Sequence, residues 1–166
     1  MDPTLGGFIT FVQNVIQPPT YFDATTSVYV TYAYNYAYQW VNSQICTVPG
    51  LQSSWNMYAI AVYNLAADFL INFAQDQLGD PIVPNTISAT SPNGLQYWAW
   101  LRSKYDVLSF FPGVIQSSSD EGTSSSYVVP EQFQNFSVAD LQSLKTPYGR
   151  TYLGIAQSWG TVWGLS

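Results

Sequence analysis

The side chains that could carry chemistry are few in this chain of 166 residues, which has ten acidic residues, four basic residues, one cysteine and no histidine. Without histidine, the Ser–His–Asp and Cys–His nucleophiles, histidine metal sites and the usual general base are excluded. Cys46 has no partner for a disulfide, and we expect it to pack in a core. No glycine-rich phosphate loop of the Walker or dinucleotide type is present. Carboxylates therefore remain the main route to catalysis.

Glycoside hydrolysis needs two carboxylates across a cleft. Asp120 and Glu121 are adjacent in a serine-rich stretch that cannot bury them, so we expect them to keep that stretch solvated. Asp68 is the only acid inside an apolar run. It would be either a buried acid with a raised pKa or, as we favour, a carboxylate that is hydrogen-bonded to a neighbouring helix. We therefore expect no enzyme activity, no cofactor and no metal site.

The element that positions Asp68 is predicted to be a long helix from Ser54 to Gly79. Ser54 can cap its first turn, and Gly79 can adopt the left-handed conformation just past its end. Apolar residues cover most of the helix, which is typical of a buried one. A narrow polar stripe remains, because four polar residues recur at every fourth position. These residues are Asn64, Asp68, Asn72 and Asp76.

A membrane span is the alternative for this apolar helix. Asp68 would then lie near the middle of the bilayer, where an acid costs about 2.5–3.5 kcal/mol. No Lys or Arg flanks the segment to set an orientation. We therefore favour a core helix and expect no membrane association.

Further helices are expected at residues 2–17, 23–46 and 95–108, and after Thr146-Pro147. Asp2-Pro3 is a typical helix start. In the second helix the alternating tyrosines from Tyr32 to Tyr38 would also suit a strand. Its length, its alanines and a cap from Asp23 favour a helix. For the fourth helix we expect one apolar face, formed by Trp98, Leu101, Tyr105 and Leu108.

The segment from Val114 to Val129 is predicted to be a protruding β-hairpin, within about residues 113–130. Two short β-branched runs flank a serine-rich tip there, as in hairpins. A disordered surface loop is the alternative. If the hairpin forms, we expect its contacts to another subunit to come from Val114, Ile115, Asp120, Glu121, Tyr127, Val128 and Val129.

The last residues, about 159–166, are expected to form an extended docking tail. Gly160 and Gly164 separate large apolar side chains from the preceding helix, and Trp is a frequent interface anchor. The alternative is that Trp163 folds back on its own helices. In the docking interpretation, the residues that bind a partner or a neighbouring subunit are Trp159, Trp163 and Leu165.

The composition indicates a surface that other subunits cover. Charged residues make up 8% of the chain, against about 25% in an ordinary soluble domain. Aromatic residues, which are enriched in interfaces, make up 17%. The net charge of −6 argues against a sequence-reading nucleic-acid binder, which needs a basic patch. Since the N-terminus lacks the pattern of a signal peptide, we expect the protein to stay in the cytoplasm where it is made.

Three stretches carry a family resemblance: MYAIAVYNLAADFLINFA, VIQSSSDEGTSSSYVVP and SVADLQSLKTPYGRTYLGIAQSWG. Residues 55–166 resemble the head-to-tail adaptor, or head-completion, proteins of tailed bacteriophages. The most specific parts are SSSDEGTS and LKTPYGRTYL. The resemblance implies a dodecameric ring in the neck of the virion, which joins the portal to a tail or neck protein around the channel for double-stranded DNA. It also implies that the tail binds the portal or an adjacent subunit, and that assembly takes place in the host cytoplasm.

The fold class that follows is mainly α: one domain over residues 1–166, with a bundle of four to five helices, the hairpin and the tail. An alternative function is an aromatic-rich module that binds carbohydrate or peptide. Another is a different phage neck or tail protein, such as a tail terminator. A hydrolase that uses Asp68 is the third.

Overall fold

Helices dominate the part of the chain that the computed structural model describes, which comprises residues 2–41, 57–84, 87, 93–108, 117–120, 123–126 and 142–158. The mainly α prediction is confirmed. The helical elements are α1 (Leu5–Phe11), the π-helix η1 (Val12–Ile16), α2 (Val28–Trp40), α3 (Met57–Phe73), α4 (Tyr97–Lys104) and α7 (Pro147–Ser158).

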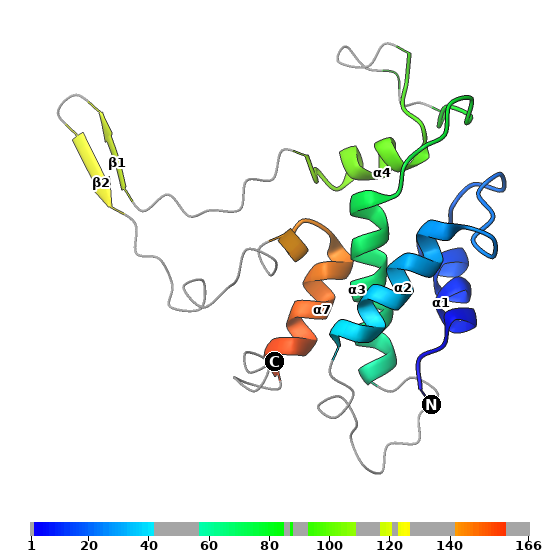
Figure 1. Ribbon diagram of the computed structural model, residues 1–166. Coiled ribbons are helices and arrows are strands. Elements are labelled where there is room, and N and C mark those ends of the chain that lie inside the picture. Colours follow the sequence, from blue (N-terminus) through cyan, green and yellow to red (C-terminus); the bar gives the residue numbers. More distant parts are fainter. Residues whose placement is uncertain are drawn as a thin grey trace.

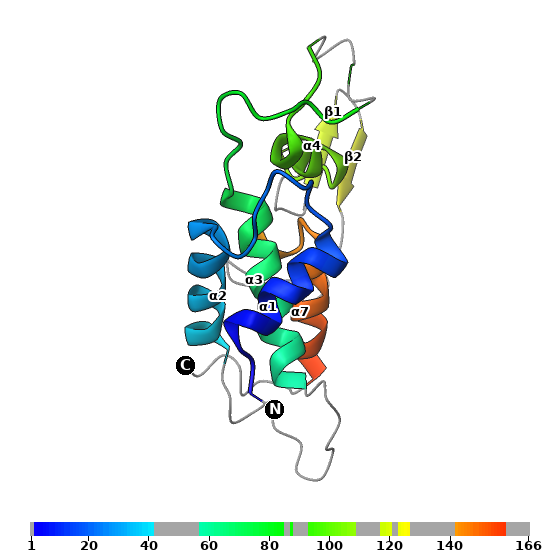
Figure 2. The same cartoon turned by 90° about the vertical axis from the view of Figure 1, so that its right-hand side faces the viewer.

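Helix α3 lies at the centre of the molecule. Figure 2 shows α2 and α7 on opposite sides of it with α1 in front, and Figure 1 shows α4 across its C-terminal end. Buried residues occur all round α3, from Tyr58 to Ile71, which confirms the prediction of a core helix. Within the described ranges, no helix is long and apolar enough to cross a membrane.

The predicted C-terminal end of this helix is wrong. Helix α3 ends at Phe73 and does not reach Gly79. The guanidinium of Arg102 donates to the carbonyls of Ile71 (3.1 Å) and Ala74 (2.6 Å). A side chain from another helix thus satisfies carbonyls that the next helical turn would have used. Gly79 does have a positive φ of 99°, but in a turn farther along. The proposed cap, Ser54, lies outside the described residues.

Helix α2 confirms the helical prediction for the tyrosine-rich segment, although its start is corrected. It begins at Val28, five residues after the expected cap. The carboxylate of Asp23 instead accepts from the backbone amide of Thr25 (2.9 Å) and from the hydroxyls of Thr25 and Thr26. These bonds hold a tight turn before the helix. The expected end near Cys46 lies outside the described residues.

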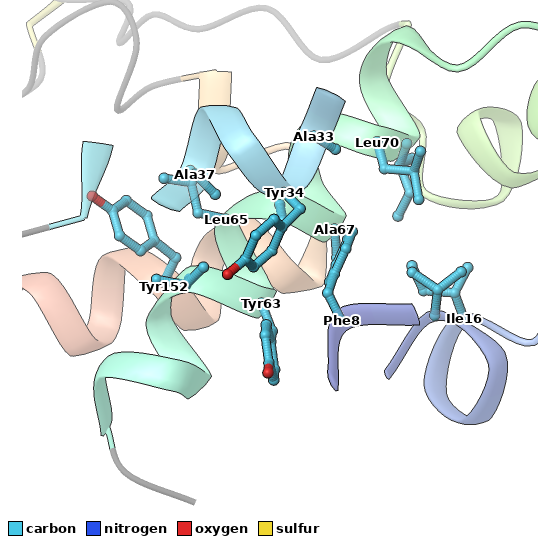
Figure 3. Packing of buried hydrophobic residues seen from close by; sticks show 14 of the residues in the cluster. Phe8, Ile16, Ala33, Tyr34, Ala37, Tyr63, Leu65, Ala67, Leu70 and Tyr152 are labelled. Atoms are coloured by element: carbon cyan, nitrogen blue, oxygen red, sulfur yellow. The ribbon is translucent and has the colours of Figure 1, made fainter. Parts of the chain in front are cut away.

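The N-terminal helix is capped by Thr4, and the predicted cap at Asp2 is wrong. Thr4 Oγ1 accepts from the amide of Gly7 at 3.1 Å. Two tyrosines hold this helix start: the Tyr34 hydroxyl donates to the Pro3 carbonyl (2.8 Å), and the Tyr63 hydroxyl accepts from the Thr4 amide (3.1 Å). Figure 3 shows Tyr34 and Tyr63 from α2 and α3 beside Phe8, which is fully buried.

Helix α4 is shorter than predicted. It ends at Lys104, and Asp106 has a positive φ of 56°, which takes the chain out of the helix. Trp98 and Leu101 are buried as expected, but Leu108 is 80% exposed. Leu108 is therefore not on the apolar face.

Strands β1 (Ser117–Asp120) and β2 (Thr123–Ser126) pair antiparallel, with Ser117 opposite Ser126 and Asp120 opposite Thr123. Figure 1 shows them to the side of the helices. The rest of the expected hairpin lies outside the described residues, so its extent and its contacts stay predictions. The undescribed contact residues are Val114, Ile115, Glu121, Tyr127, Val128 and Val129.

Candidate functional site

A row of aromatic side chains follows the outer side of α2 and continues onto α3. Tyr32, Tyr36 and Trp40 are four residues apart, so they lie above one another on the helix. Helix α3 adds Phe69 and Phe73. We call these five residues the aromatic face. Their rings are in contact: the ring centroids are 4.0 Å apart for Tyr36 and Phe69, 5.5 Å for Tyr36 and Trp40, and 5.7 Å for Tyr32 and Phe73.

The aromatic face is open to solvent. Tyr32 is 59% and Trp40 is 60% exposed, while the other three side chains are half-buried beneath them. An aromatic side chain can bury about 150–250 Å², so the face leaves a large apolar area in water. Clustered apolar side chains on a surface mark a site that binds another molecule, unlike single exposed ones.

The aromatic face also lacks charge. No Asp, Glu, Lys or Arg occurs between Asp23 and Asp68 in the sequence, so α2 carries none. The one charged residue of α3 is Asp68, which is only 5% exposed and is bonded toward α7. The face therefore presents stacked rings and phenol hydroxyls, which suit an apolar partner. It has no positive charge that could bind a phosphate backbone.

Asp68 lies on another side of α3, where it holds the start of α7. Its carboxylate accepts a hydrogen bond from the Thr146 hydroxyl (2.5 Å) and one from the Asn72 side-chain amide (3.2 Å). Thr146 is itself fully buried, and its Oγ1 accepts from the Gly149 amide (3.0 Å), as at a helix N-cap. The expected hydrogen bond from a neighbouring helix is present, and Thr146-Pro147 begins that helix as predicted.

Burial raises the pKa of Asp68 from its ordinary value of 3.8 to about 6. Hydrogen bonds from Thr146, Asn72 and Ser143 and the charge of Lys145 act in the opposite direction. These partners are donors and a cation, as in a structural carboxylate, whereas glycosidases pair two carboxylates. In the described part of the chain, no three His, Cys, Asp or Glu side chains gather in a way that could hold a metal ion.

The contact of Asp68 and its partners with the start of α7, which we call the α7 junction, includes Gly149, a residue that the sequence reasoning missed. A Cβ at this position would collide with the backbone carbonyl of Ser143 and lie 2.8 Å from Asp68 Oδ1. The missing side chain thus lets the first turn of α7 approach α3. The signal was present in the TPYGR stretch, because a glycine inside a helix weakens it unless close packing requires it.

The predicted polar stripe divides into separate sites. Asn64 donates to the carbonyl of Ile60 (2.8 Å) within α3, while Asp68 and Asn72 belong to the α7 junction. Asp76 lies beyond the end of α3. Its carboxylate accepts from the amides of Trp98 (2.8 Å) and Ala99 (2.9 Å) at the start of α4. Helix periodicity predicted that Asp76 lies on the same stripe as the other three residues. This is wrong, because α3 ends before Asp76.

A hollow of about 300 Å³ lies near the end of η1. Its one charged residue is Asp23, whose carboxylate Thr25 and Thr26 already engage. The lining residues are Gln13, Pro18, Pro19, Thr20, Phe22, Asp23 and Ala24. We find no set of convergent free polar groups among them of the kind that orients a small ligand.

The tail residues predicted to bind a partner lie outside the described residues, so the structure does not place Trp159, Trp163 and Leu165. Asp120 is the last residue of β1.

Comparison of the chain with protein-family models, with curated proteins and with solved structures found no match.

Proposed function

We propose that this chain is a structural virion protein, a head-to-tail adaptor of a tailed bacteriophage. In this role, copies of the chain form a ring, expected to be a dodecamer, between the portal and a tail or neck protein. Double-stranded DNA passes through the ring without sequence-specific binding. The virion neck is the site of action, and assembly takes place in the host cytoplasm.

The aromatic face is the observation that carries this proposal. An exposed, uncharged cluster on regular helices is what a subunit presents to another protein, and Tyr and Trp are the residues that contribute most to such contacts. The family resemblance of residues 55–166 supplies the identity of the assembly. The projecting hairpin, the extended tail and the bundle of four to five helices are part of the same proposal.

A carbohydrate-binding module would use the same aromatic residues as stacking platforms. The Tyr36 ring, however, is stacked on Phe69 at 4.0 Å and contacts Trp40 at 5.5 Å, so part of its surface is already covered. A sugar site also needs polar groups placed to orient the ligand, and the five residues of the aromatic face supply only two phenol hydroxyls and one indole N–H. The geometry favours a protein partner.

The test is a measurement of particle mass by light scattering, with and without the portal protein of the same virus, followed by electron microscopy. We expect rings, and a complex in which the ring closes one end of the portal. A tail terminator would form rings but would bind the tail tube in place of the portal. A strict monomer with affinity for sugars would contradict the adaptor function.

A further inference from the structure

We propose that the occupant of the aromatic face is a second copy of this chain, so that Tyr32, Tyr36 and Trp40 lie in the contact between neighbouring subunits. This inference rests on the proposed ring function and names the surface through which the copies meet.

Charge decides where two identical copies can meet. Each copy has a net charge of −6, so copies repel one another wherever acidic surfaces come close. The sequence from residue 24 to residue 67 contains no acidic or basic residue, and this range includes all of α2. At the aromatic face, two copies can approach without placing like charges opposite each other, which would oppose docking.

The geometry of the aromatic face suits a stable contact. Tyr36 rests on Phe69, and Tyr32 meets Phe73 edge to face at 5.7 Å. Because these rings are already packed and sit on two helices that pack together, binding orders few additional side-chain torsions. Tyr32 and Trp40 project from this platform with more than half of their surface in solvent. They are therefore the anchors that a neighbouring copy would bury.

Other exposed apolar residues lack this arrangement and supply the control. Leu78 is 107% and Leu108 is 80% exposed, and both lie in turns outside the helices. The test variant is Tyr32→Lys with Trp40→Lys, and the control variant is Leu78→Lys with Leu108→Lys. Both add two positive charges and replace two exposed large side chains, so the control tests whether the added charge alone affects assembly.

Molar mass is measured by light scattering over a range of concentrations, with circular dichroism and thermal unfolding on the same samples. We expect the control variant to assemble like the wild type. The aromatic-face variant should keep its helicity but need at least about tenfold more protein to assemble. The milder Tyr32→Gln with Trp40→Gln variant replaces the lysine pair if that pair lowers helicity, and it should show the same shift in the same direction.

The possible outcomes separate this inference from the proposed function. If the wild type forms rings and the aromatic-face variant forms them at the same concentration, the inference is overturned while the adaptor function stands. If the variant instead loses thermal stability as a monomer with its assembly unchanged, the face is covered by its own chain, and the inference is again overturned. A wild type that never assembles, alone or with the portal, removes the adaptor function itself.

Discussion

Two sides of α3 reverse the usual relation between residue type and burial. On the side of α7, the carboxylate of Asp68 is 5% exposed and the Thr146 hydroxyl is fully buried. On the side of α2, Tyr32 and Trp40 are more than half exposed. The buried polar groups have partners within the chain, which makes their burial tolerable. The exposed rings, by contrast, leave apolar surface in contact with water. The first region therefore holds the fold together, and the second is available for another molecule.

If this contrast is right, changes at the α7 junction lower stability, and changes at the aromatic face lower assembly. The largest effect is expected from the ionisation of Asp68. Burial raises the pKa of Asp68 in the folded protein from 3.8 to about 6. The contribution of this side chain to the free energy of unfolding is therefore fully present below pH 3.8 and is lost as the pH rises through 6. Relative to Asp68→Asn, the free energy of unfolding of the wild type should fall over this window by on the order of 3 kcal/mol.

Urea unfolding of the wild type and Asp68→Asn at matched pH values measures this difference, because the other acids contribute equally to both proteins. A wild type that gains stability over the variant as the pH rises would mean that the junction favours the charged carboxylate. The wild type and Asp68→Asn should assemble equally well at any pH at which both are folded.

A pair of glycine substitutions in α7 sharpens the contrast within one helix. In Gly149→Ala the new Cβ meets the Ser143 carbonyl and Asp68, which should lower the free energy of unfolding by about 1–3 kcal/mol. In Gly154→Ala nothing lies within 4 Å of the new Cβ, so the better helix propensity of alanine should raise it by about 0.5–1 kcal/mol. Opposite signs in chemical denaturation would confirm close packing at the junction. Equal gains would show that α7 does not approach α3 as described.

Thr146→Val removes the hydroxyl that joins Asp68 to the start of α7 while keeping the side-chain shape. The loss should be about 1–2 kcal/mol, because the Gly149 amide loses its cap and Asp68 loses a donor. Thr151→Val is the control, since the Thr151 hydroxyl donates to the Pro147 carbonyl at an exposed site of the same helix. In thermal unfolding, the Thr146 variant should have a clearly lower melting temperature than the Thr151 variant. Similar melting temperatures would argue against a stabilising contact at Thr146.

The smallest effect on stability is expected from deleting residues 161–166, which lie outside the described residues. If the tail docks on a partner, the truncated protein keeps its helicity and melting temperature but fails to join portal to tail, which electron microscopy of the assembly reaction detects. If the deletion unfolds the protein, Trp163 belongs to the core of its own subunit and the docking tail is wrong.

The sequence predicted what local spacing and capping residues control. These account for the burial of α3 and for the start of α7 at Thr146-Pro147, whereas the helical state of α2 was predicted in part from a cap at Asp23 that does not form. It failed where a distant side chain decides the outcome. Arg102 ends α3 early, and Gly149 matters only because Ser143 and Asp68 lie beside it. The aromatic face was not located for the same reason, since the composition indicates a covered surface but does not show which side of α2 the neighbouring helices leave exposed.

The ends of α3 and α4 stabilise each other in a way that should govern how they open. Arg102 of α4 holds the last carbonyls of α3, while Asp76, just after α3, holds the first amides of α4. The two side chains also approach each other, with 3.9 Å between Arg102 Nη2 and Asp76 Oδ2. Neither helix end can fray without removing the cap of the other. The amides at both ends should therefore exchange with solvent deuterium in one cooperative step, at a common opening free energy.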